Sequence, residues 1–251
     1  MRKPLVDPDQ AARPVFVLSE RYAALRSPWH RHQRAQFVYA SEGVHTVRTD
    51  TGLWVVPPQR AVWILPGERH RGSAPRGCWL RTLYAQPGAA PLPPQCCVVN
   101  VDRLLGLLLV EASGFGADYP EQGPEQRLMQ VIVDRLAALD VVSAHLPWPT
   151  DPRLLQLAQR LEADPADQRP LAALAADCGM TDRTAARLFA KDTGLSFGQW
   201  RQQLRLLKAM EPLSQGRSVT QVALDVGYAD VSSFIAVFRQ AFGDTPARYF
   251  R

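Results

Sequence analysis

The sequence predicts an α+β protein: an N-terminal β-barrel with a helical pair, then a C-terminal all-α domain in which a helix pair occurs twice. From Pro14 to about Ala85, short runs rich in valine, tryptophan, tyrosine and threonine alternate with glycine and proline, which is typical of a barrel or sandwich. Beyond Pro152 the apolar residues recur at helical spacing instead. We therefore expect a barrel domain at 1–99, a helical pair at 100–146, a Pro-rich linker at 147–152 and a helical domain at 153–251.

The composition supports a protein with two cores and narrows its class. The chain has 251 residues and 46% hydrophobic content, enough for two domains of ordinary size. Its net charge of +5 favours an anionic partner. No apolar run reaches the roughly 18 residues of a membrane helix, and the first residues lack the apolar centre of a secretory signal. We expect a cytoplasmic protein without a membrane partner.

Strands of the barrel are predicted in QFVYASEG, GVHTVRT, GLWVVPPQ, AVWILPGERH and CWLRTLYAQ, and CCVVNV follows as a closing strand. Two helices come next, in VDRLLGLLLVEAS and PEQRLMQVIVDRLAAL. The second has apolar residues at helical spacing, among them Leu128, Val131 and Leu139. This stripe can cover the barrel or pair two subunits, and periodicity does not distinguish the two.

A repeat organises the helical domain. LAADCGMTDRTAARLFAKDTG and VALDVGYADVSSFIAVFRQAFG each contain a short helix, a turn at Gly179 or Gly227, and a second helix that Thr181 or Asp230 can cap. Two helices joined by a short glycine turn form a helix-turn-helix. The domain therefore contains two such units.

The second helix of each unit has a side chain pattern suited to double-stranded DNA. In the first unit, cations stand four residues apart opposite the predicted core, as on a helix that reads the major groove. The candidate DNA-binding residues of this helix are Arg183, Thr184, Arg187 and Lys191. In the second unit, small and apolar groups suit thymine methyls and phosphates. The candidates there are Val231, Ser232, Ala236 and Arg239.

The segment SFGQWRQQLRLLKAMEPL between the units predicts a helix of about 16 residues, or about 24 Å. This length brings the units close to the roughly 34 Å that separates successive major grooves on one face of DNA. One chain is therefore expected to read two adjacent grooves.

The last hundred residues resemble the DNA-binding domain of the AraC/XylS family of transcription regulators. The resemblance is carried by VALDVGYADVSSFIAVFRQAFGDTPARYFR, with its Gly-Tyr turn, Ser-Phe pair, Phe-Gly and Thr-Pro-x-x-Tyr ending. It implies that both recognition helices enter the major groove and that Arg183 and Arg187 face bases. It also places Val231, Ser232 and Ala236 near DNA, although that helix lacks the long polar side chains of base readout.

Histidines mark a second candidate site in the barrel. On a strand, His30 and His32 would point to the same side. The N-terminal half resembles the cupin-type sensor of many such regulators: His30, His32, Gln36 and Gly43 follow the cupin spacing with Gln in place of Glu, and LPGERH supplies a later His70.

Three imidazoles and an amide oxygen can bind a divalent transition metal such as Zn, Ni, Fe or Cu. The alternatives are that these residues line the pocket of a small-molecule effector or are purely structural. His45 and His145 lie outside the motif, and we expect them to be incidental.

These observations predict a sequence-specific DNA-binding transcriptional regulator, not an enzyme. It would respond to a small molecule or metal in the cupin domain and is expected to be a homodimer, either repressor or activator. One alternative is a constitutive DNA-binding regulator whose cupin is only a scaffold. The other is a cupin metalloenzyme, against which stand the missing carboxylate and the attached DNA-binding units.

Overall fold

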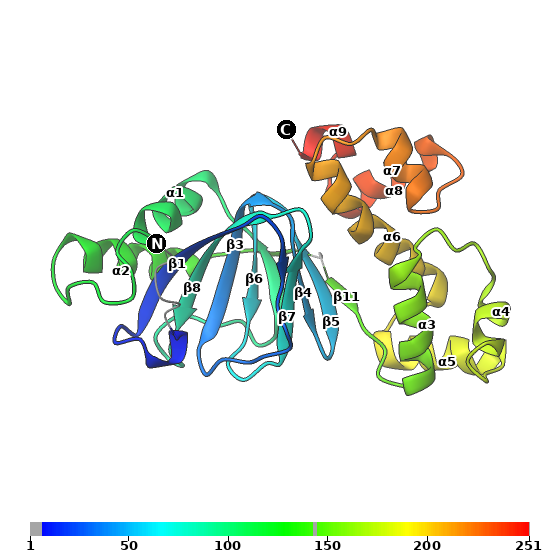
Figure 1. The fold of residues 1–251 in the computed structure, drawn as a ribbon, viewed down its shortest axis with the longest axis horizontal. Coiled ribbons are helices and arrows are strands. Elements are labelled where there is room, and N and C mark those ends of the chain that lie inside the picture. Colours follow the sequence, from blue (N-terminus) through cyan, green and yellow to red (C-terminus); the bar gives the residue numbers. More distant parts are fainter. Residues whose placement is uncertain (1–6, 143–144, 251) are drawn as a thin grey trace. The chain divides into compact units, whose positions relative to one another are not determined.

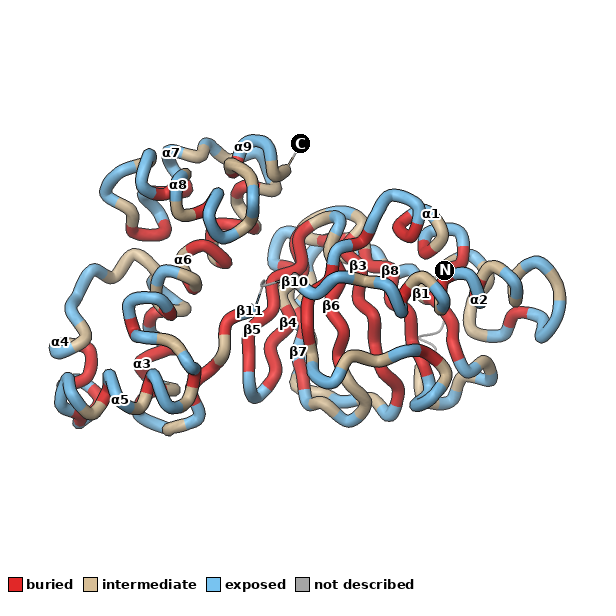
Figure 2. The backbone as a smooth tube through the Cα atoms, turned by 180° about the vertical axis from the view of Figure 1, so that it is seen from behind, coloured by how far each residue is buried: buried red, intermediate tan, exposed pale blue. Residues whose placement is uncertain are grey.

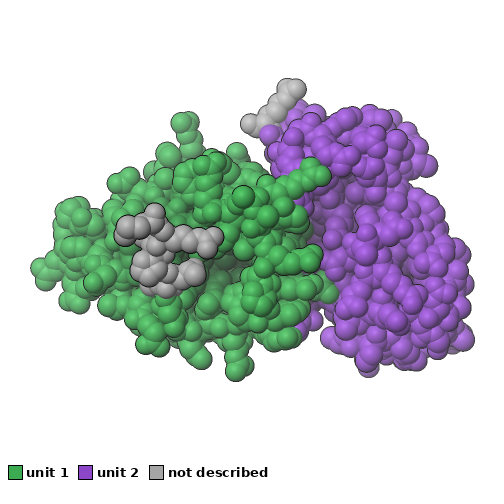
Figure 3. All heavy atoms as spheres, viewed as in Figure 1, with its two compact units in different colours: residues 1–49, 54–144 green, residues 50–53, 145–251 purple. Residues whose placement is uncertain are grey.

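A computed structural model describes residues 7–142 and 145–250 of the chain (Figure 1). Residues 1–6 of the predicted barrel domain and 143–144 of the predicted helical-pair segment lie outside the described residues. Contacts divide the chain into two compact units, one of residues 1–49 and 54–144 and the other of residues 50–53 and 145–251 (Figure 3). The α+β prediction is confirmed, because strands dominate the first unit and helices the second.

The strands form two antiparallel sheets. After a short 3-10 helix η1 (Pro8–Gln10), the six-stranded sheet has the order β1-β8-β3-β6-β9-β10 and the five-stranded sheet the order β11-β5-β4-β7-β2. The strands of the first sheet are β1 (Val15–Tyr22), β3 (Ala35–Gly43), β6 (Arg60–Ile64), β8 (Cys78–Ala85), β9 (Cys97–Asn100) and β10 (Val141–Val142). Those of the second are β2 (Leu25–Arg26), β4 (His45–Thr49), β5 (Gly52–Val56), β7 (His70–Ala74) and β11 (His145–Pro147).

The six-stranded sheet is buried on both faces, as the predominantly red central strands of Figure 2 show. Because side chains alternate along a strand, Val38 and Ala40 of β3 face a core shared with the other sheet. Phe37 and Tyr39 face the opposite way, into a second core beneath two helices. The predicted barrel core includes Trp54 and Trp63, which are buried, whereas Trp79 is half-buried.

Two helices cover this second face: α1 (Arg103–Ala112) and α2 (Pro124–Leu136). The Asp102 carboxylate caps α1 by accepting a hydrogen bond from the backbone N–H of Leu105. Arg135 of α2 donates to the same carboxylate and so ties the end of α2 to the start of α1. The helical pair thus packs within its own chain, one of the two roles left open for it.

The second unit contains the predicted repeat. Its helices are α3 (Pro152–Ala163), α4 (Leu171–Ala176), α5 (Asp182–Thr193), α6 (Phe197–Ser214), α7 (Val219–Asp225), α8 (Val231–Phe242) and α9 (Pro246–Tyr249). The pairs α4–α5 and α7–α8 are the two helix-turn-helix units, joined by α6. Gly179 and Gly227 have positive φ of 68° and 90° at the two turns, as predicted.

The Pro-rich segment after residue 146 is packed, although its prolines suggested a linker. Trp148 is 2% exposed, and its ring lies edge-on to Trp200 of α6 at 5.3 Å. Trp200 in turn donates its indole N–H to the Pro147 carbonyl. No helix among the described residues combines the length and apolar character needed to span a membrane.

Candidate functional site

Three histidines converge in the first unit. His30 and His70 form an antiparallel bridge, in which each backbone N–H donates to the other's carbonyl at 2.9 and 2.8 Å. The carbonyl of His32 accepts from the backbone N–H of Gly67 at 2.8 Å. His30 belongs to this isolated bridge and to no strand, and His32 lies before the start of β3. The expectation that one strand aligns the two histidines was therefore wrong. Backbone pairing of His30 to the start of β7 and of His32 to Gly67, just before that strand, aligns them instead.

The side chains of this cluster are close enough to share one small ligand. A ring nitrogen from each of His30, His32 and His70 lies within 4.8 Å of the others. Ring centroids are 4.3 Å apart for His30 and His70, 5.0 Å for His30 and His32, and 5.7 Å for His32 and His70. His70 is buried and the other two are half-buried, which leaves the cluster accessible from one side.

Backbone carbonyls orient two of the rings. Nδ1 of His30 lies 2.9 Å from the Pro28 carbonyl, and Nδ1 of His70 lies 2.9 Å from the Glu68 carbonyl. A carbonyl oxygen only accepts, so each Nδ1 must carry the proton and each Nε2 of a neutral ring keeps its lone pair. Such outer hydrogen bonds are those that fix the tautomer of metal-binding histidines.

Burial also keeps imidazoles of the cluster neutral. It lowers the pKa of His70 to about 4, and the nearby His30 and His32 act in the same direction. The pKa of His32 is likewise lowered, first by burial and then by the neighbouring His30. A neutral imidazole is the form that binds a metal ion. The donor set therefore fits a divalent transition metal.

Gln36 lies at the inner surface of the six-stranded sheet. Its strand partners in the register are Tyr84 and Ile64, and the Tyr84 ring lies edge-on to His32 with centroids 5.9 Å apart. Gln36 is 5% exposed, and its Nε2 has no hydrogen-bond partner among the described residues. The register thus places Gln36 beside Tyr84, whose ring contacts His32 of the cluster.

His45, on β4 of the five-stranded sheet, is also buried near the cluster, which sequence reasoning missed. It is 4% exposed, and its ring packs over Gly72, where a Cβ would lie 2.6 Å from the imidazole Cε1. Its Nδ1 has no hydrogen-bond partner within the described ranges. Burial lowers its pKa to about 4, helped by the nearby His70. The signal in the sequence was GVHTVRT, where alternation puts His45 on the same face as Val47.

The second helix of the first helix-turn-helix unit, α5, presents its cations to solvent. Phe189 of α5 is fully buried, whereas Arg183, Arg187 and Lys191 are exposed. These three form no ion pair with any residue the structure describes. Thr184 is half-buried, and its backbone N–H and hydroxyl both contact the hydroxyl of the N-cap Thr181. Three of the four predicted residues thus form a free cationic stripe.

The corresponding helix of the second unit, α8, offers a different surface. Its candidates Ser232, Ala236 and Arg239 are exposed and Val231 is half-buried. The N-cap Asp230 accepts hydrogen bonds from the backbone N–H groups of Ser232 and Ser233. α8 therefore shows small and apolar groups along most of its length, with one cation in its last turn.

Comparisons with known proteins agree with this architecture. Residues 14–92 match the AraC-like ligand binding domain, and residues 174–251 match a helix-turn-helix domain. The HTH-type transcriptional regulator NimR of Escherichia coli is 33% identical over 94% of this chain and 86% of its own length. RipA of Corynebacterium glutamicum is 38% identical over 41% of this chain and 31% of its own length. The solved structure of ToxT from Vibrio cholerae aligns with a TM-score of 0.41 at 10% identity, covering 95% of this chain and 98% of that one.

Proposed function

We propose that this chain, which belongs to the AraC family of DNA-binding transcriptional regulators, holds a divalent transition metal at His30, His32 and His70 as part of its sensing function. The convergence of three ring nitrogens within 4.8 Å carries the proposal. Imidazole ligands suit Zn, Ni, Fe and Cu. With three protein ligands, a fourth position remains for water, an effector or the Gln36 amide oxygen.

The metal proposal competes with a reading in which the histidines only line an effector pocket. The carbonyl contacts of His30 and His70 favour the metal, because they direct both Nε2 lone pairs away from the backbone. No carboxylate belongs to the cluster among the described residues, so the bound ion would keep its positive charge. Gln36 in place of an acid therefore lowers the affinity without removing the ligand geometry.

For the DNA-binding half, we propose that α5 and α8 are the recognition helices. Arg183 and Arg187 would contact base edges and Lys191 a phosphate, supported by their exposure and lack of ion-pair partners in the described chain. On α8, Val231, Ser232 and Ala236 would approach the duplex and Arg239 a phosphate. Thr184 would serve mainly to hold the start of α5, because its hydroxyl is engaged with Thr181.

We also propose a homodimer formed through the helical pair. Leu104, Leu107 and Val110 recur along the outer side of α1 and are 51%, 58% and 41% exposed, and Val131 of α2 is 47% exposed. Such a row of large apolar side chains is uncommon on a monomer. Leu107→Lys should shift the protein from dimer to monomer in light scattering. Leu224→Lys, at a similarly exposed leucine of α7, should not.

A sensor of this kind acts by binding one arrangement of the chain better than another. The relatives are transcriptional regulators, which supports a regulatory rather than an enzymatic role for this chain. A regulator acts on the chromosome, which supports a cytoplasmic location. A constitutive regulator with an inert barrel remains the alternative, and it predicts DNA affinity that the metal does not alter.

The test is metal analysis of the full-length protein by mass spectrometry after equilibration with Zn²⁺, Ni²⁺, Cu²⁺ or Fe²⁺. We expect near-stoichiometric metal in the wild type and its loss in His32→Ala. The matched control is His145→Ala, which removes an exposed histidine outside the cluster. Binding of the protein to its preferred DNA duplex, found by selection from random sequences, is then titrated with and without the metal.

Each result decides between the readings. Metal that is lost in His32→Ala and changes DNA affinity supports a metal-dependent sensor. Metal without any effect on DNA supports a structural site in a constitutive regulator. Absence of metal from the wild type under all four conditions would overturn the metal proposal and leave the histidines as pocket walls.

A further inference from the structure

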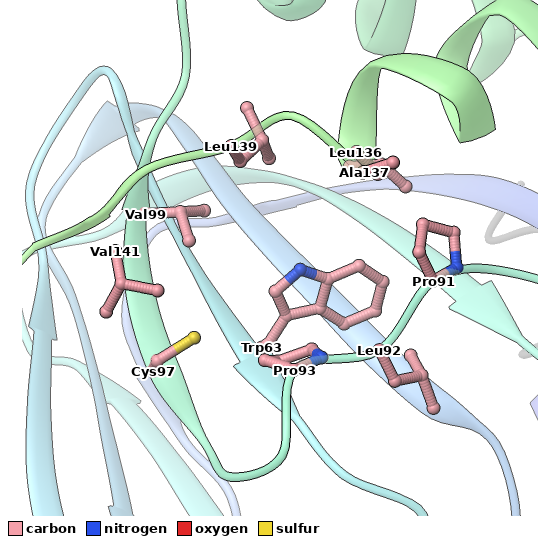
Figure 4. A pocket seen from close by; sticks show the side chains of 10 residues that line it. All are labelled: Trp63, Pro91, Leu92, Pro93, Cys97, Val99, Leu136, Ala137, Leu139 and Val141. Carbon is pink, nitrogen blue, oxygen red and sulfur yellow. The ribbon is translucent and has the colours of Figure 1, made fainter.

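The outer face of the six-stranded sheet contains a pocket that is separate from the histidine cluster. Figure 4 shows it between β6, β9, the Pro-rich segment after β8 and the end of α2. Trp63, Cys97 and Val99 form its floor and belong to the core beneath α1 and α2. Their strand neighbours Val62 and Val98 point into the other core, between the sheets. The pocket and the inner surface that carries Gln36 are therefore on opposite faces of one sheet.

The lining of this pocket selects against charge. Its residues are proline, leucine, valine, alanine, tryptophan and cysteine, and none of them carries an ionised group or a side-chain oxygen. Burial raises the pKa of the Cys97 thiol, which keeps that sulfur neutral as well. An ion entering here would lose hydration without gaining a charged side chain as partner, whereas an apolar surface gains by leaving water. The pocket thus suits a neutral, apolar molecule.

Its size limits that molecule to about one ring. The cavity volume is about 160 Å³. An apolar cavity of about 150 Å³ is known to accommodate benzene. The walls are also fixed in place: Trp63 is 2% exposed and packs edge-on to Phe37 at 5.0 Å, and Pro91 and Pro93 stiffen the neighbouring segment. A preformed rigid pocket costs a ligand little ordering.

The rim allows entry without unfolding. Ala137 and Val141 both line the pocket and are exposed, and Val141 is 64% exposed. Leu136 in the last turn of α2 is buried and closes the other side. A ligand would therefore contact the end of α2, the helix that Arg135 ties to Asp102 at the start of α1.

From volume, lining and rigidity, we infer that this pocket is a second ligand site of the regulator, for a neutral single-ring aromatic or a hydrocarbon of similar size. It is independent of the proposed metal site, since no residue is shared between them. A ligand that bridges the sheet and α2 stabilises the folded first unit by mass action. It also favours the position of α2 in which its contacts to the sheet are complete.

The test uses fluorobenzene as the probe and the full-length protein, followed by ¹⁹F NMR line broadening. Wild type should broaden the signal saturably, and toluene should reverse the effect by competition. Cys97→Leu fills the floor and Ala137→Phe narrows the rim, so both should abolish saturable broadening. Ala138→Phe adds the same ring at the next, exposed residue outside the lining and should bind as the wild type does.

Thermal unfolding and far-UV circular dichroism show whether each variant is folded. If Cys97→Leu does not fold, Ala137→Phe against Ala138→Phe still decides the question. Saturable broadening that persists in the folded filled variants would overturn the assignment to this pocket. So would a wild type that shows no saturable broadening up to the solubility of the probe. Loss in the filled variants alone, with a rise in the unfolding temperature of the wild type, supports the inference.

Discussion

The two helix-turn-helix units share a backbone plan but differ in the chemistry that they expose. In each, a helix of 12 residues begins at a side-chain cap and ends at a glycine in the left-handed region, Gly194 in α5 and Gly243 in α8. In each, a fully buried phenylalanine anchors the helix, Phe189 or Phe238. The geometry that presents a helix to DNA is therefore the same in both units.

The exposed faces have diverged under that shared plan. α5 carries Arg183, Arg187 and Lys191 in the open, whereas α8 offers Ser232 and Ala236 with a single cation at its end. Cations with a fork of donors can read guanine, while small groups mainly allow close approach. The comparison teaches that the buried positions are alike in the two units and the exposed positions differ, as the proposed base readout by α5 and close approach by α8 require.

The largest expected difference between the units is in how much stability each loses when the glycine of its turn is replaced by alanine. A Cβ on Gly179 would meet nothing within 4 Å, whereas one on Gly227 would lie 2.8 Å from Ala166 Cα and 2.8 Å from the Arg205 guanidinium. Arg205 cannot easily move, because it donates to the Pro165 and Asp167 carbonyls.

Gly179→Ala should therefore cost only the positive φ, about 1–2 kcal/mol of unfolding free energy. Gly227→Ala adds overpacking and should cost about 2–5 kcal/mol. Urea unfolding of the full chain measures both. Equal losses would show that the second unit relaxes around the added methyl group and that the two turns are equivalent.

The next effect concerns DNA. Arg187→Ala should cost about 1–3 kcal/mol at the preferred duplex, found by selection from random sequences, and should relax sequence preference. Arg239→Ala on α8 should weaken binding more evenly across sequences, because a phosphate contact carries no sequence information. Fluorescence anisotropy on the preferred and a random duplex separates the two. Uniform loss for Arg187→Ala would assign it to phosphate and remove the proposed division of labour.

The sequence correctly predicted the structural features that depend only on residues close together along the chain. The turn glycines Gly179 and Gly227 and the caps Thr181 and Asp230 are local, because each acts within a few residues of itself. These predictions are confirmed in both units.

Features that depend on pairing between distant segments were harder to predict. The bridge from His30 to His70 sets the histidine cluster, and no local pattern specifies that register. His45 was set aside because it lies outside the motif, and its packing over Gly72, which lies across the sheet in β7, follows only from the fold. The apolar pocket likewise needs four segments to meet, so its existence follows only from the fold.

The smallest expected effect is a difference in pH dependence between the N-caps of the two units: the stability lost on replacing the cap should depend on pH in only one of them. Thr181 caps α5 with a hydroxyl that does not titrate, and Thr181→Ala should cost about 0.5–2 kcal/mol at every pH. Asp230 caps α8 with a carboxylate whose pKa lies below its ordinary value of 3.8, chiefly because the Ser233 hydroxyl donates to it, together with the backbone N–H groups of Ser233 and Ser232.

A carboxyl with a depressed pKa stabilises the folded state above its unfolded pKa and loses that stabilisation as the pH falls through its folded value. The penalty of Asp230→Ala should therefore be present at neutral pH and shrink below about pH 4, while that of Thr181→Ala stays constant. Urea midpoints for both variants and the wild type across that range provide the measurement. Asp230→Asn, which keeps an accepting oxygen without the charge, is the matched control and should remove the pH dependence while retaining part of the stability. A stability penalty for Asp230→Ala that does not change with pH would mean that the contacts of this side chain to the backbone and Ser233 do not depend on its charge. The caps of the two units would then stabilise their helices in the same pH-independent way.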